Sequence, residues 1–337
     1  MKILFVGHHM PHYLHTNVYR EKAIRELGHE LIFFDDRKFI LPGRIRDRVV
    51  ILQKWDFNRL NYKLIETAKD TQPDLIIVMG TRLPLPTSDT LRKLRKSCSR
   101  IVLWVTDAPR HQGFSLIEKT APLYDHVFCA GTEHMEIFEM LGVHRMSWLS
   151  FACDPDYHKP QKLSDAEKRK LGHDIVFVGA YYPNRWKIID TLESFDVGVW
   201  GPYWKQDVGN VSHSAHIYNQ KVDVTEWTKI YSAAKIVLVI HYQDGATICH
   251  QASPKVYEAL ACGCFVLVDR QKDVFRVFKD GNHLVGFDSA RDLREKVSWY
   301  LDHPEDRKRI SESGLHEVLR NHTYRHRIQT IMDTVFS

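Results

Sequence analysis

A short stretch around Glu258 combines residue types that could bind a nucleotide diphosphate. Ser253 and Pro254 are typical of the first positions of a helix and Gly263 of its end, so we predict a short helix between them. The free N–H groups of a helix N-terminus attract phosphates. Glu258 lies one turn further in, where a carboxylate could accept hydrogen bonds from two ribose hydroxyls. A capped helix before a strand also occurs in proteins without such a ligand, so both interpretations stay open here.

Basic residues that could neutralise the phosphates occur in two places. Lys255 takes the second position of the predicted helix. Arg185 follows Gly179, in a segment that comes directly after the predicted strand 175–178 and begins another helix. Gly179 would let the backbone approach a ligand closely. The alternatives are a capping role alone for Ser253 and an ordinary surface position for Arg185.

Two further loops are candidates for contact with such a ligand. Gly201 follows the predicted strand 197–200, and backbone groups at this point could meet the nucleotide base. Tyr203 and Trp204 could stack on the base or belong to the core. The backbone near Thr247 could approach the sugar, although a flexible loop explains this segment as well.

Candidates for a catalytic base lie in the first half of the chain. Ligands of open α/β sheets bind at the carboxyl ends of the strands. Asp107 follows the predicted strand 101–105, His111 lies four residues later, and His9 follows the first strand. A carboxylate or imidazole there could deprotonate an acceptor hydroxyl. A polar residue at a strand end can equally be a turn former or a helix cap.

No metal site is indicated by the sequence. The six cysteines form no Cys-x-x-Cys pair, and the 20 histidines form no His-Glu-x-x-His pattern. Asp154-Pro155-Asp156 has the spacing of a metal-binding Asp-x-Asp motif, but it lies in a charged, proline-containing segment that we interpret as a turn. We therefore expect no metal and no bound cofactor.

The stretch Ser-Pro-Lys-Val-Tyr-Glu-Ala-Leu-Ala-Cys-Gly at 253–263 resembles the donor-binding segment of GT-B glycosyltransferases. Their pattern is Glu-Ala-(Met/Leu)-Ala-x-Gly followed by a strand. The C-terminal part is similar to one group 1-like branch, the spore-maturation CgeB-like glycosyltransferases, over roughly residues 174–330. That similarity lies at 268–270, 278–282, 300–305 and 322–327.

The resemblance implies transfer of a sugar from a nucleotide-diphosphate sugar, with UDP favoured, to an acceptor hydroxyl without a metal. Glu258 would hold the ribose, Arg185 and Lys255 the diphosphate, and Asp107 would act as the base. The chain departs from the pattern at His250, where many retaining members carry an acid eight residues before Glu258. The stereochemical outcome therefore stays open.

Other functions remain possible on the same fold. One is a nucleotide-sugar 2-epimerase-like activity, and another is a protein that binds sugar nucleotides without catalysis. The acceptor could be a glycan, a small molecule or DNA with hydroxylated bases.

The length and the order of elements predict two domains. With 337 residues in alternating strands and helices, the chain fits an α/β, GT-B architecture of two Rossmann-like, doubly wound domains facing a central cleft. We expect an N-terminal, acceptor-side domain at 1–152 and a nucleotide-sugar domain at 153–322. The last helix, about 323–337, would pack back onto the first domain, and the charged segment 154–173 would be the linker.

The expected elements follow from hydrophobic periodicity and from cap and stop residues. The strands are predicted at 2–6, 31–34, 75–79, 101–105, 126–130, 146–151, 175–178, 197–200, 236–240, 264–268 and 284–287. The helices are predicted at 17–27, 88–96, 132–141, 184–192, 226–234, 253–262, 290–301, 305–320 and 323–336. A further long helix is expected to end at about residue 69, and its beginning within 37–60 is left open. Residues 202–224 are expected to form a loop.

Charge and composition narrow the class of protein. The net charge of +5 suits anionic partners, and we expect Lys and Arg to be spread along the chain, with a solvated basic helix face at 92–96. The sequence shows no apolar run long enough for a transmembrane helix and no signal-peptide pattern. We therefore expect a protein of the reducing cytoplasm.

Overall fold

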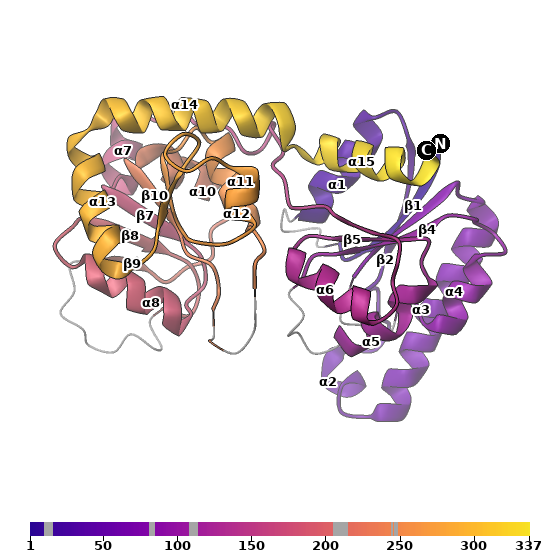
Figure 1. The fold of residues 1–337 in the computed structure, drawn as a ribbon. Coiled ribbons are helices and arrows are strands. Elements are labelled where there is room, and N and C mark those ends of the chain that lie inside the picture. Colours follow the sequence, from indigo (N-terminus) through magenta and orange to yellow (C-terminus); the bar gives the residue numbers. More distant parts are fainter. Residues whose placement is uncertain (10–15, 81–84, 108–113, 205–214, 244, 246–248) are drawn as a thin grey trace. The chain divides into compact units, whose positions relative to one another are not determined.

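A computed structural model describes residues 1–9, 16–80, 85–107, 114–204, 215–243, 245 and 249–337. The chain divides into two compact units, which are Met1–Ser150 with Arg325–Ser337, and Phe151–Tyr324. Each unit is built on one parallel six-stranded sheet (Figure 1).

The first unit has the strand order β2-β1-β3-β4-β5-β6. Its strands are β1 (Lys2–Gly7), β2 (Glu30–Asp35), β3 (Leu75–Met79), β4 (Ile101–Val105), β5 (His126–Cys129) and β6 (Met146–Trp148). Its helices are α1 (Thr16–Glu26), α2 (Gly43–Arg46), α3 (Val50–Thr71), α4 (Ser88–Leu94), α5 (Phe114–Thr120), the 3₁₀ turn η1 (Ala121–Leu123), α6 (Thr132–Met140) and α15 (Tyr324–Phe336).

The second unit has the strand order β12-β11-β10-β7-β8-β9. Its strands are β7 (Ile175–Val178), β8 (Val197–Trp200), β9 (His216–Tyr218), β10 (Ile236–Val239), β11 (Val266–Asp269) and β12 (Val285–Phe287). Its helices are α7 (Asp165–Leu171), α8 (Pro183–Ile189), the 3₁₀ turn η2 (Asp190–Leu192), α10 (Val224–Ala233), α11 (Pro254–Ala261), α12 (Val274–Val277), α13 (Ala290–Asp302) and α14 (Pro304–Asn321).

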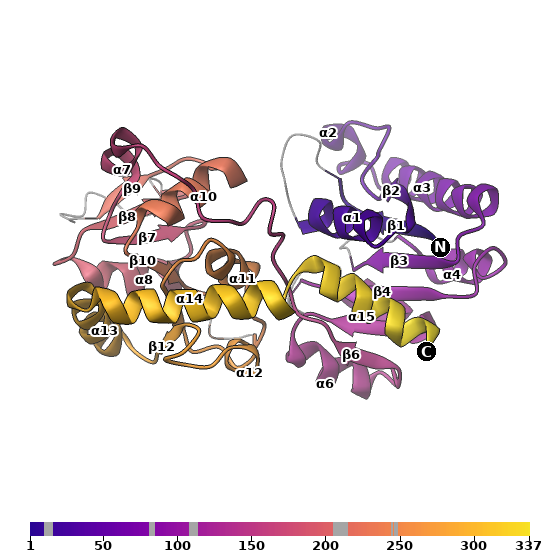
Figure 2. The same cartoon turned by 90° about the horizontal axis from the view of Figure 1, so that it is seen from above.

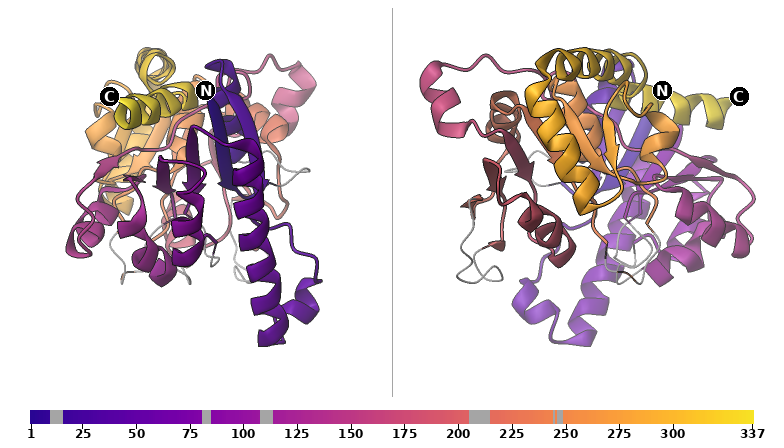
Figure 3. Two further views of the ribbon diagram at one scale, coloured as in Figure 1. Left: turned by 90° about the vertical axis from the view of Figure 1, so that its right-hand side faces the viewer. Right: turned by 60° about the vertical axis from the view of Figure 1, so that its left-hand side comes forward.

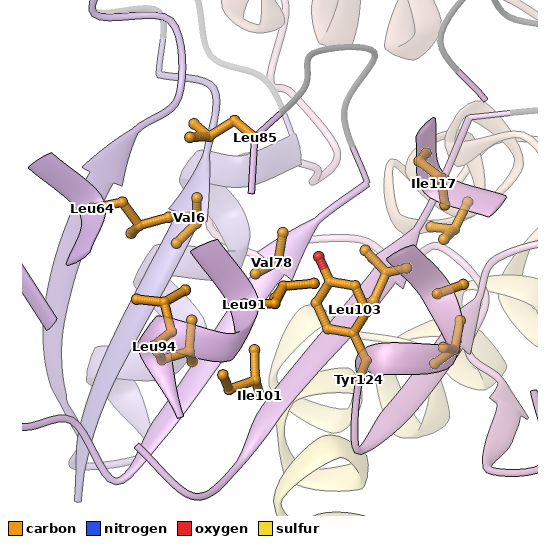
Figure 4. Close-up of a cluster of buried hydrophobic side chains, with 14 of the residues drawn as sticks. Val6, Leu64, Val78, Leu85, Leu91, Leu94, Ile101, Leu103, Ile117 and Tyr124 are labelled. Carbon is orange, nitrogen blue, oxygen red and sulfur yellow. The ribbon is translucent and has the colours of Figure 1, made fainter. Parts of the chain in front are cut away.

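The central strands are apolar on both faces because helices cover both sides of each sheet. Every residue of β3 and β4 is buried, and their side chains alternate between two packed layers. Figure 4 shows one such layer of the first unit, where Val78 of β3 and Leu103 of β4 lie beside Leu91 of α4 and Tyr124. This continuous burial places polar residues only after the strand ends.

The last helix belongs to the first unit. Arg100, just before β4, donates from Nε to the carbonyl oxygen of Val335 at 3.3 Å and lies over the ring of Phe336 at 4.5 Å. Arg327 donates to the backbone oxygen of Ser150 at 3.0 Å. Figure 2 shows α15 lying along this unit.

The predicted fold class is confirmed, because both units are doubly wound parallel α/β sheets. The segment 154–173, predicted to be the linker, falls within the second unit and contains α7, where Ser164 and Glu167 form a capping box at the start of the helix. No residue of α7 is buried, so the helix has no apolar stripe to reveal it. The loop predicted at 202–224 contains the edge strand β9, and the short helices α5 and α12 were not predicted.

Candidate functional site

Polar and basic side chains of the second unit gather where its central strands end. Gly179 follows β7, His241 follows β10, and Asp269 is the last residue of β11. Helix α11 starts at the same edge of the sheet. We call Gly179, Arg185, Ser253, Lys255 and Glu258 the α11 cluster, because all of them lie at or near the start of this helix.

The first turn of α11 is held by a chain of hydrogen bonds. Ser253 is the N-cap, and its side-chain oxygen accepts from the backbone N–H of Lys255 at 3.4 Å. The backbone N–H of Ser253 donates to Nε2 of His241 at 2.9 Å. The other ring nitrogen, Nδ1, lies 2.5 Å from Asp269 Oδ1. His241 is therefore the neutral tautomer with its proton on Nδ1, and it fixes the direction of the helix N-terminus.

Lys255 carries its ammonium group next to the backbone of Gly179. A Cβ atom built on Gly179 would lie only 2.6 Å from Lys255 Nζ, so glycine at 179 leaves the room that the ammonium occupies. Burial and the neighbouring charge of Arg185 lower the pKa of Lys255 to about 7, against the opposing effect of Glu258. The ammonium group of Lys255 is thus partly removed from water, which disfavours its charged form.

Arg185 is 8% exposed and is fixed by backbone carbonyl groups. Its Nε donates to Ile240 O at 3.1 Å and its Nη1 to Ala180 O at 2.9 Å. Burial lowers its pKa, but an arginine stays charged at neutral pH. The surface position considered for Arg185 is wrong, because the guanidinium is packed into this edge of the sheet.

Neither cation of the α11 cluster forms an ion pair within the described residues, although the charge of Glu258 acts on Lys255 and that of Asp269 on Arg185 from beyond 4.0 Å. No carboxylate oxygen of that part of the chain lies within 4.0 Å of Lys255 Nζ or of the Arg185 guanidinium. Burying positive charge without a partner is costly. Together with the N-terminus of α11, these side chains form an arrangement that can accommodate an anion.

Glu258 lies one turn inside α11 and is 14% exposed. Burial raises its pKa to about 7, and the positive charge of Lys255 opposes this rise. Its Oε1 lies 4.0 Å from Nε2 of His158, whose pKa burial lowers to about 3. Because His158 Nδ1 accepts the backbone N–H of Asp154, the neutral ring carries its proton on Nε2, toward the carboxylate. When it is ionised, the Glu258 carboxylate can accept hydrogen bonds from hydroxyl groups of a ligand.

The backbone conformation at position 201 requires a glycine. Its φ is +149°, and an added Cβ would lie 2.0 Å from the carbonyl oxygen of Gly179. That oxygen accepts the indole N–H of Trp204 at 2.8 Å. Trp204 is fully buried, so it belongs to the core and is not available for stacking, whereas Tyr203 is 57% exposed.

Asp107 lies two residues beyond β4 in the first unit and is exposed. Its backbone oxygen is 2.7 Å from Nε2 of the buried His134, which anchors the start of this loop. The position at a strand end is as predicted, and the side chain is accessible to a substrate.

His9 follows β1 and has a carboxylate neighbour that the sequence did not reveal. Its Nδ1 lies 3.5 Å from Oε1 of Glu21 in α1, and its ring lies 5.0 Å from the ring of Phe33. Burial raises the pKa of Glu21, while the nearby His9 lowers it. A carboxylate that orients an imidazole is the usual support of a histidine base.

Two predicted site residues, His111 and Thr247, lie outside the described residues. His250 is half-buried, and its backbone oxygen accepts the N–H of Asp273 at 3.0 Å. This position, eight residues before Glu258, therefore carries an imidazole where many retaining GT-B enzymes would carry a carboxylate.

Two groups of potential metal ligands occur in the part of the chain that the structure describes. His173, Asp196 and His216 form one, and His8, Asp35 and Asp36 the other; in each, the ligand atoms lie within 4.8 Å of one another. The first group lies at the amino ends of β7–β9, away from Gly179 and Gly201. Neither group contains a member of the α11 cluster.

His241 and Asp269 lie at the candidate site but were not predicted from the sequence. Both stand at ends of apolar strands, which was the available signal, since polar residues at such ends commonly face the ligand edge of a sheet. The pairing across two strands depends on the sheet order, which a single sequence does not provide.

Comparisons of sequence and of structure both find known proteins that are similar to this chain. Residues 185–333 match a family model described as glycosyl transferase-like. The chain is 22% identical over 268 residues to the spore protein CgeB of Bacillus subtilis (strain 168), covering 75% of this chain and 80% of that protein. The predicted resemblance to CgeB-like glycosyltransferases is confirmed.

Solved structures share the whole fold. HepE of Anabaena, in complex with UDP-glucose, is 13% identical with a TM-score of 0.67, covering 100% of this chain and 99% of that one. Sucrose-phosphate synthase of Thermosynechococcus elongatus is 12% identical with a TM-score of 0.69, covering 99% of both chains. At these identities the likeness shows the fold, which is the two-domain GT-B fold.

Proposed function

We propose that this chain, a glycosyltransferase by its matched domain and its GT-B fold, moves a sugar from a UDP-sugar to an acceptor hydroxyl without a metal ion. The observation that carries the proposal is the pair of cations at α11, Lys255 and Arg185, with no carboxylate partner within the described residues. A nucleoside diphosphate supplies the missing negative charge.

The phosphates would rest against the N-terminus of α11. The backbone N–H groups after Ser253, the ammonium of Lys255 and the guanidinium of Arg185 all offer donors to phosphate oxygens. In the transition state, negative charge develops on the departing diphosphate. Fixed cations stabilise this charge without reorganising, which is the contribution that a metal ion makes in other enzymes.

The ribose would be held by Glu258. As a carboxylate it accepts two hydrogen bonds, which matches the vicinal 2′- and 3′-hydroxyls. Ionisation of Glu258 is unfavourable in the unliganded site, where its pKa is about 7, and becomes favourable when hydroxyl groups donate to it. UDP is favoured as the nucleotide because HepE, which shares the fold, was solved with UDP-glucose.

The acceptor base would come from the first unit. Asp107 is the first candidate, since its carboxylate is exposed at a strand end. His9 is the second, with Glu21 as its orienting carboxylate. His111 completes the set of candidates. The base takes the hydroxyl proton while the acceptor oxygen bonds to the anomeric carbon and the bond to the diphosphate breaks.

The proposal is tested by measuring UDP release from a panel of UDP-sugars, with and without acceptors and with EDTA or Mg²⁺. The acceptors are glycans, small-molecule alcohols and DNA with hydroxymethylated bases. We expect UDP release that requires one acceptor class and persists in EDTA. Asp107→Asn should lower kcat by about 10²–10⁴-fold while UDP binding is unchanged.

Three results would overturn this assignment. Interconversion of UDP-sugars without any acceptor would indicate an epimerase-like reaction. UDP binding without turnover on any acceptor of the panel would indicate a binding protein. Release that stops in EDTA and returns with Mg²⁺ would contradict the absence of a metal.

A further inference from the structure

One part of the first unit exposes apolar and basic side chains together. It consists of α2, the first two turns of α3 and the residues that join them. We call it the α2–α3 surface and define it by its exposed members, Ile40, Arg44, Ile45, Arg48, Val49, Val50, Ile51, Lys54 and Trp55.

The apolar members of this surface are exposed to an unusual degree. Ile51 is 78% exposed, Val50 63% and Trp55 51%. The opposite side of α3 packs Leu60 and Leu64 into the core of the unit, so the helix already has its buried stripe. Figure 3 (left) shows α3 running beyond the neighbouring helices with α2 beside its end. The exposed apolar residues therefore form a second stripe that the fold itself leaves in water.

The α2–α3 surface is an ordered platform. The carboxylate of the buried Asp56 accepts the backbone N–H groups of Ile40 and Leu41, at 3.1–3.3 Å, and the Nε–H of Arg59 at 3.0 Å. These bonds attach the segment before α2 to the body of α3. The guanidinium carbon of Arg46 in α2 lies 3.8 Å from the ring centroid of Phe39, which is a second contact between α2 and the segment before it. The apolar side chains are thus presented by a fixed scaffold.

The part of the chain that carries this surface is strongly basic. Residues 37–63 contain eight Lys and Arg and two Asp and Glu, a net charge of +6, whereas the whole chain carries +5. Both acids are already paired, Asp47 with Arg46 and Asp56 with Arg59. The run at 92–96 is more densely basic, but its apolar residue, Leu94, is buried, so that run lacks the exposed apolar side chains of the α2–α3 surface.

We propose that the α2–α3 surface docks on an anionic lipid surface. Aliphatic side chains and a tryptophan that insert at the headgroup level, flanked by Lys and Arg that meet anionic headgroups, are the two contributions that hold a protein at such an interface. No described helix is long and apolar enough to cross a membrane, so this contact would be peripheral.

The chemistry of the surface favours lipid over other partners. A nucleic acid would pair with Arg44, Arg48 and Lys54 but offers little to Val50 and Ile51, since its exposed backbone is polar. A second copy of the chain that packed the same surface against itself would bring like charges together. An anionic lipid surface, unlike these two partners, satisfies both the basic and the apolar side chains.

Vesicle sedimentation with the full chain tests this inference without any nucleotide-sugar, so it can fail independently of the proposed function. We expect binding to vesicles that contain 30% phosphatidylglycerol and weak binding to pure phosphatidylcholine. Arg44→Gln/Arg48→Gln/Lys54→Gln should weaken binding by about a hundredfold, since each basic residue near an anionic membrane contributes about fivefold. Ile51→Gln/Trp55→Gln should weaken it by at least about tenfold.

Matched controls come from other exposed sites. Arg92→Gln/Lys93→Gln/Lys96→Gln removes the same amount of charge from α4 and the residues after it, and Trp299→Gln removes a tryptophan that is 55% exposed. Both should bind vesicles as the wild type does. Trp55→Phe should bind normally yet reduce the quenching of tryptophan fluorescence by brominated lipids, which places residue 55 among the acyl chains even if the double variant folds poorly.

Several results would overturn the inference. These are no binding to anionic vesicles at low salt, equal losses in the control variants, and unchanged lipid quenching in Trp55→Phe. Tight binding to duplex DNA that Ile51→Gln/Trp55→Gln leaves intact would assign the surface to nucleic acid. A dimer that the same double variant dissociates would assign it to self-association.

Discussion

His241 accepts the backbone N–H of Ser253 at 2.9 Å, and this bond connects the end of β10 to the first turn of α11. Asp269 holds the opposite nitrogen of the same ring. The orientation of the helix N-terminus, where the proposed diphosphate would bind, thus depends on an imidazole that need not touch the ligand.

The first prediction concerns this link. His241→Phe keeps the ring volume but leaves the N–H of Ser253 and the carboxylate of Asp269 without the imidazole. We expect the free energy of unfolding to fall by about 2–3 kcal/mol and UDP affinity to fall at least tenfold, because buried polar groups lose their partner. Urea unfolding and calorimetric titration measure both quantities. His216→Phe, at a site 60% exposed, is the control. Unchanged UDP affinity in His241→Phe would exclude this positioning role.

The second prediction separates two glycines. Gly201→Ala should destabilise the protein by about 2–4 kcal/mol, since its φ is +149° and the Cβ would meet the backbone oxygen of Gly179. Gly179→Ala would meet the movable end of Lys255 and, less closely, the ring of Phe177 at 3.0 Å, so we expect a loss of stability of about 1–2 kcal/mol and UDP binding weakened about tenfold. Melting temperatures and Kd values of the two variants decide this. The reverse ranking of the two melting temperatures would refute the account of Gly201.

The third prediction follows from the lowered pKa of Lys255, about 7 in the unliganded protein. A bound diphosphate favours the charged ammonium, so binding above pH 7 should take up close to one proton. The Kd of UDP should then rise by up to about tenfold per pH unit above 7.

Calorimetry at pH 8 in buffers of different ionisation enthalpy measures this proton uptake. Lys255→Met should bind more weakly and take up no proton, whereas Lys187→Met, at an exposed position of α8, should behave as the wild type. Equal proton uptake in Lys255→Met would show that another group titrates.

The fourth prediction uses the raised pKa of Glu258. Between about 4.5 and 7 the folded protein keeps a proton on Glu258 that the unfolded chain has lost. The contribution of the protonated Glu258 to the free energy of unfolding is therefore complete below pH 4.5 and is lost as the pH rises through about 7. Relative to Glu258→Gln, the wild type should lose about 3 kcal/mol of unfolding free energy across this window. Parallel stability curves of the two proteins would contradict the shift.

The α11 cluster could be predicted in large part because its signals are local. Ser253, Pro254 and Gly263 define the helix, and Lys255 and Glu258 follow by counting along it. The same holds for the strands, whose continuous apolar runs are typical of parallel sheets covered on both faces.

The residues that were missed depend on contacts between distant parts of the chain. His241 and Asp269 meet because β10 and β11 are neighbours, and Glu21 reaches His9 from a different element. Helix α7 was missed for another reason. All its residues are solvent-facing or half-buried, so no hydrophobic period marks it, and only its capping box remains as a signal.

The concentration of charge at 37–63 could have been counted from the sequence. That these charges flank exposed apolar side chains could be seen only in the structure. Periodicity does not reveal that Ile51 and Trp55 face solvent while Leu60 and Leu64 fill the core.

The central claim is that α11 binds a nucleoside diphosphate without a metal. It is tested most directly by a thermal-shift panel of UDP, GDP, CDP, ADP and dTDP on the wild type and Glu258→Ala, each with and without Mg²⁺. A ligand at 100 times its Kd stabilises by about 2.7 kcal/mol, or about 4 °C in melting temperature for a chain of this length. We predict a shift with UDP in the wild type that Mg²⁺ does not increase and that Glu258→Ala loses. No shift with any diphosphate, or a shift that requires Mg²⁺, would contradict the claim.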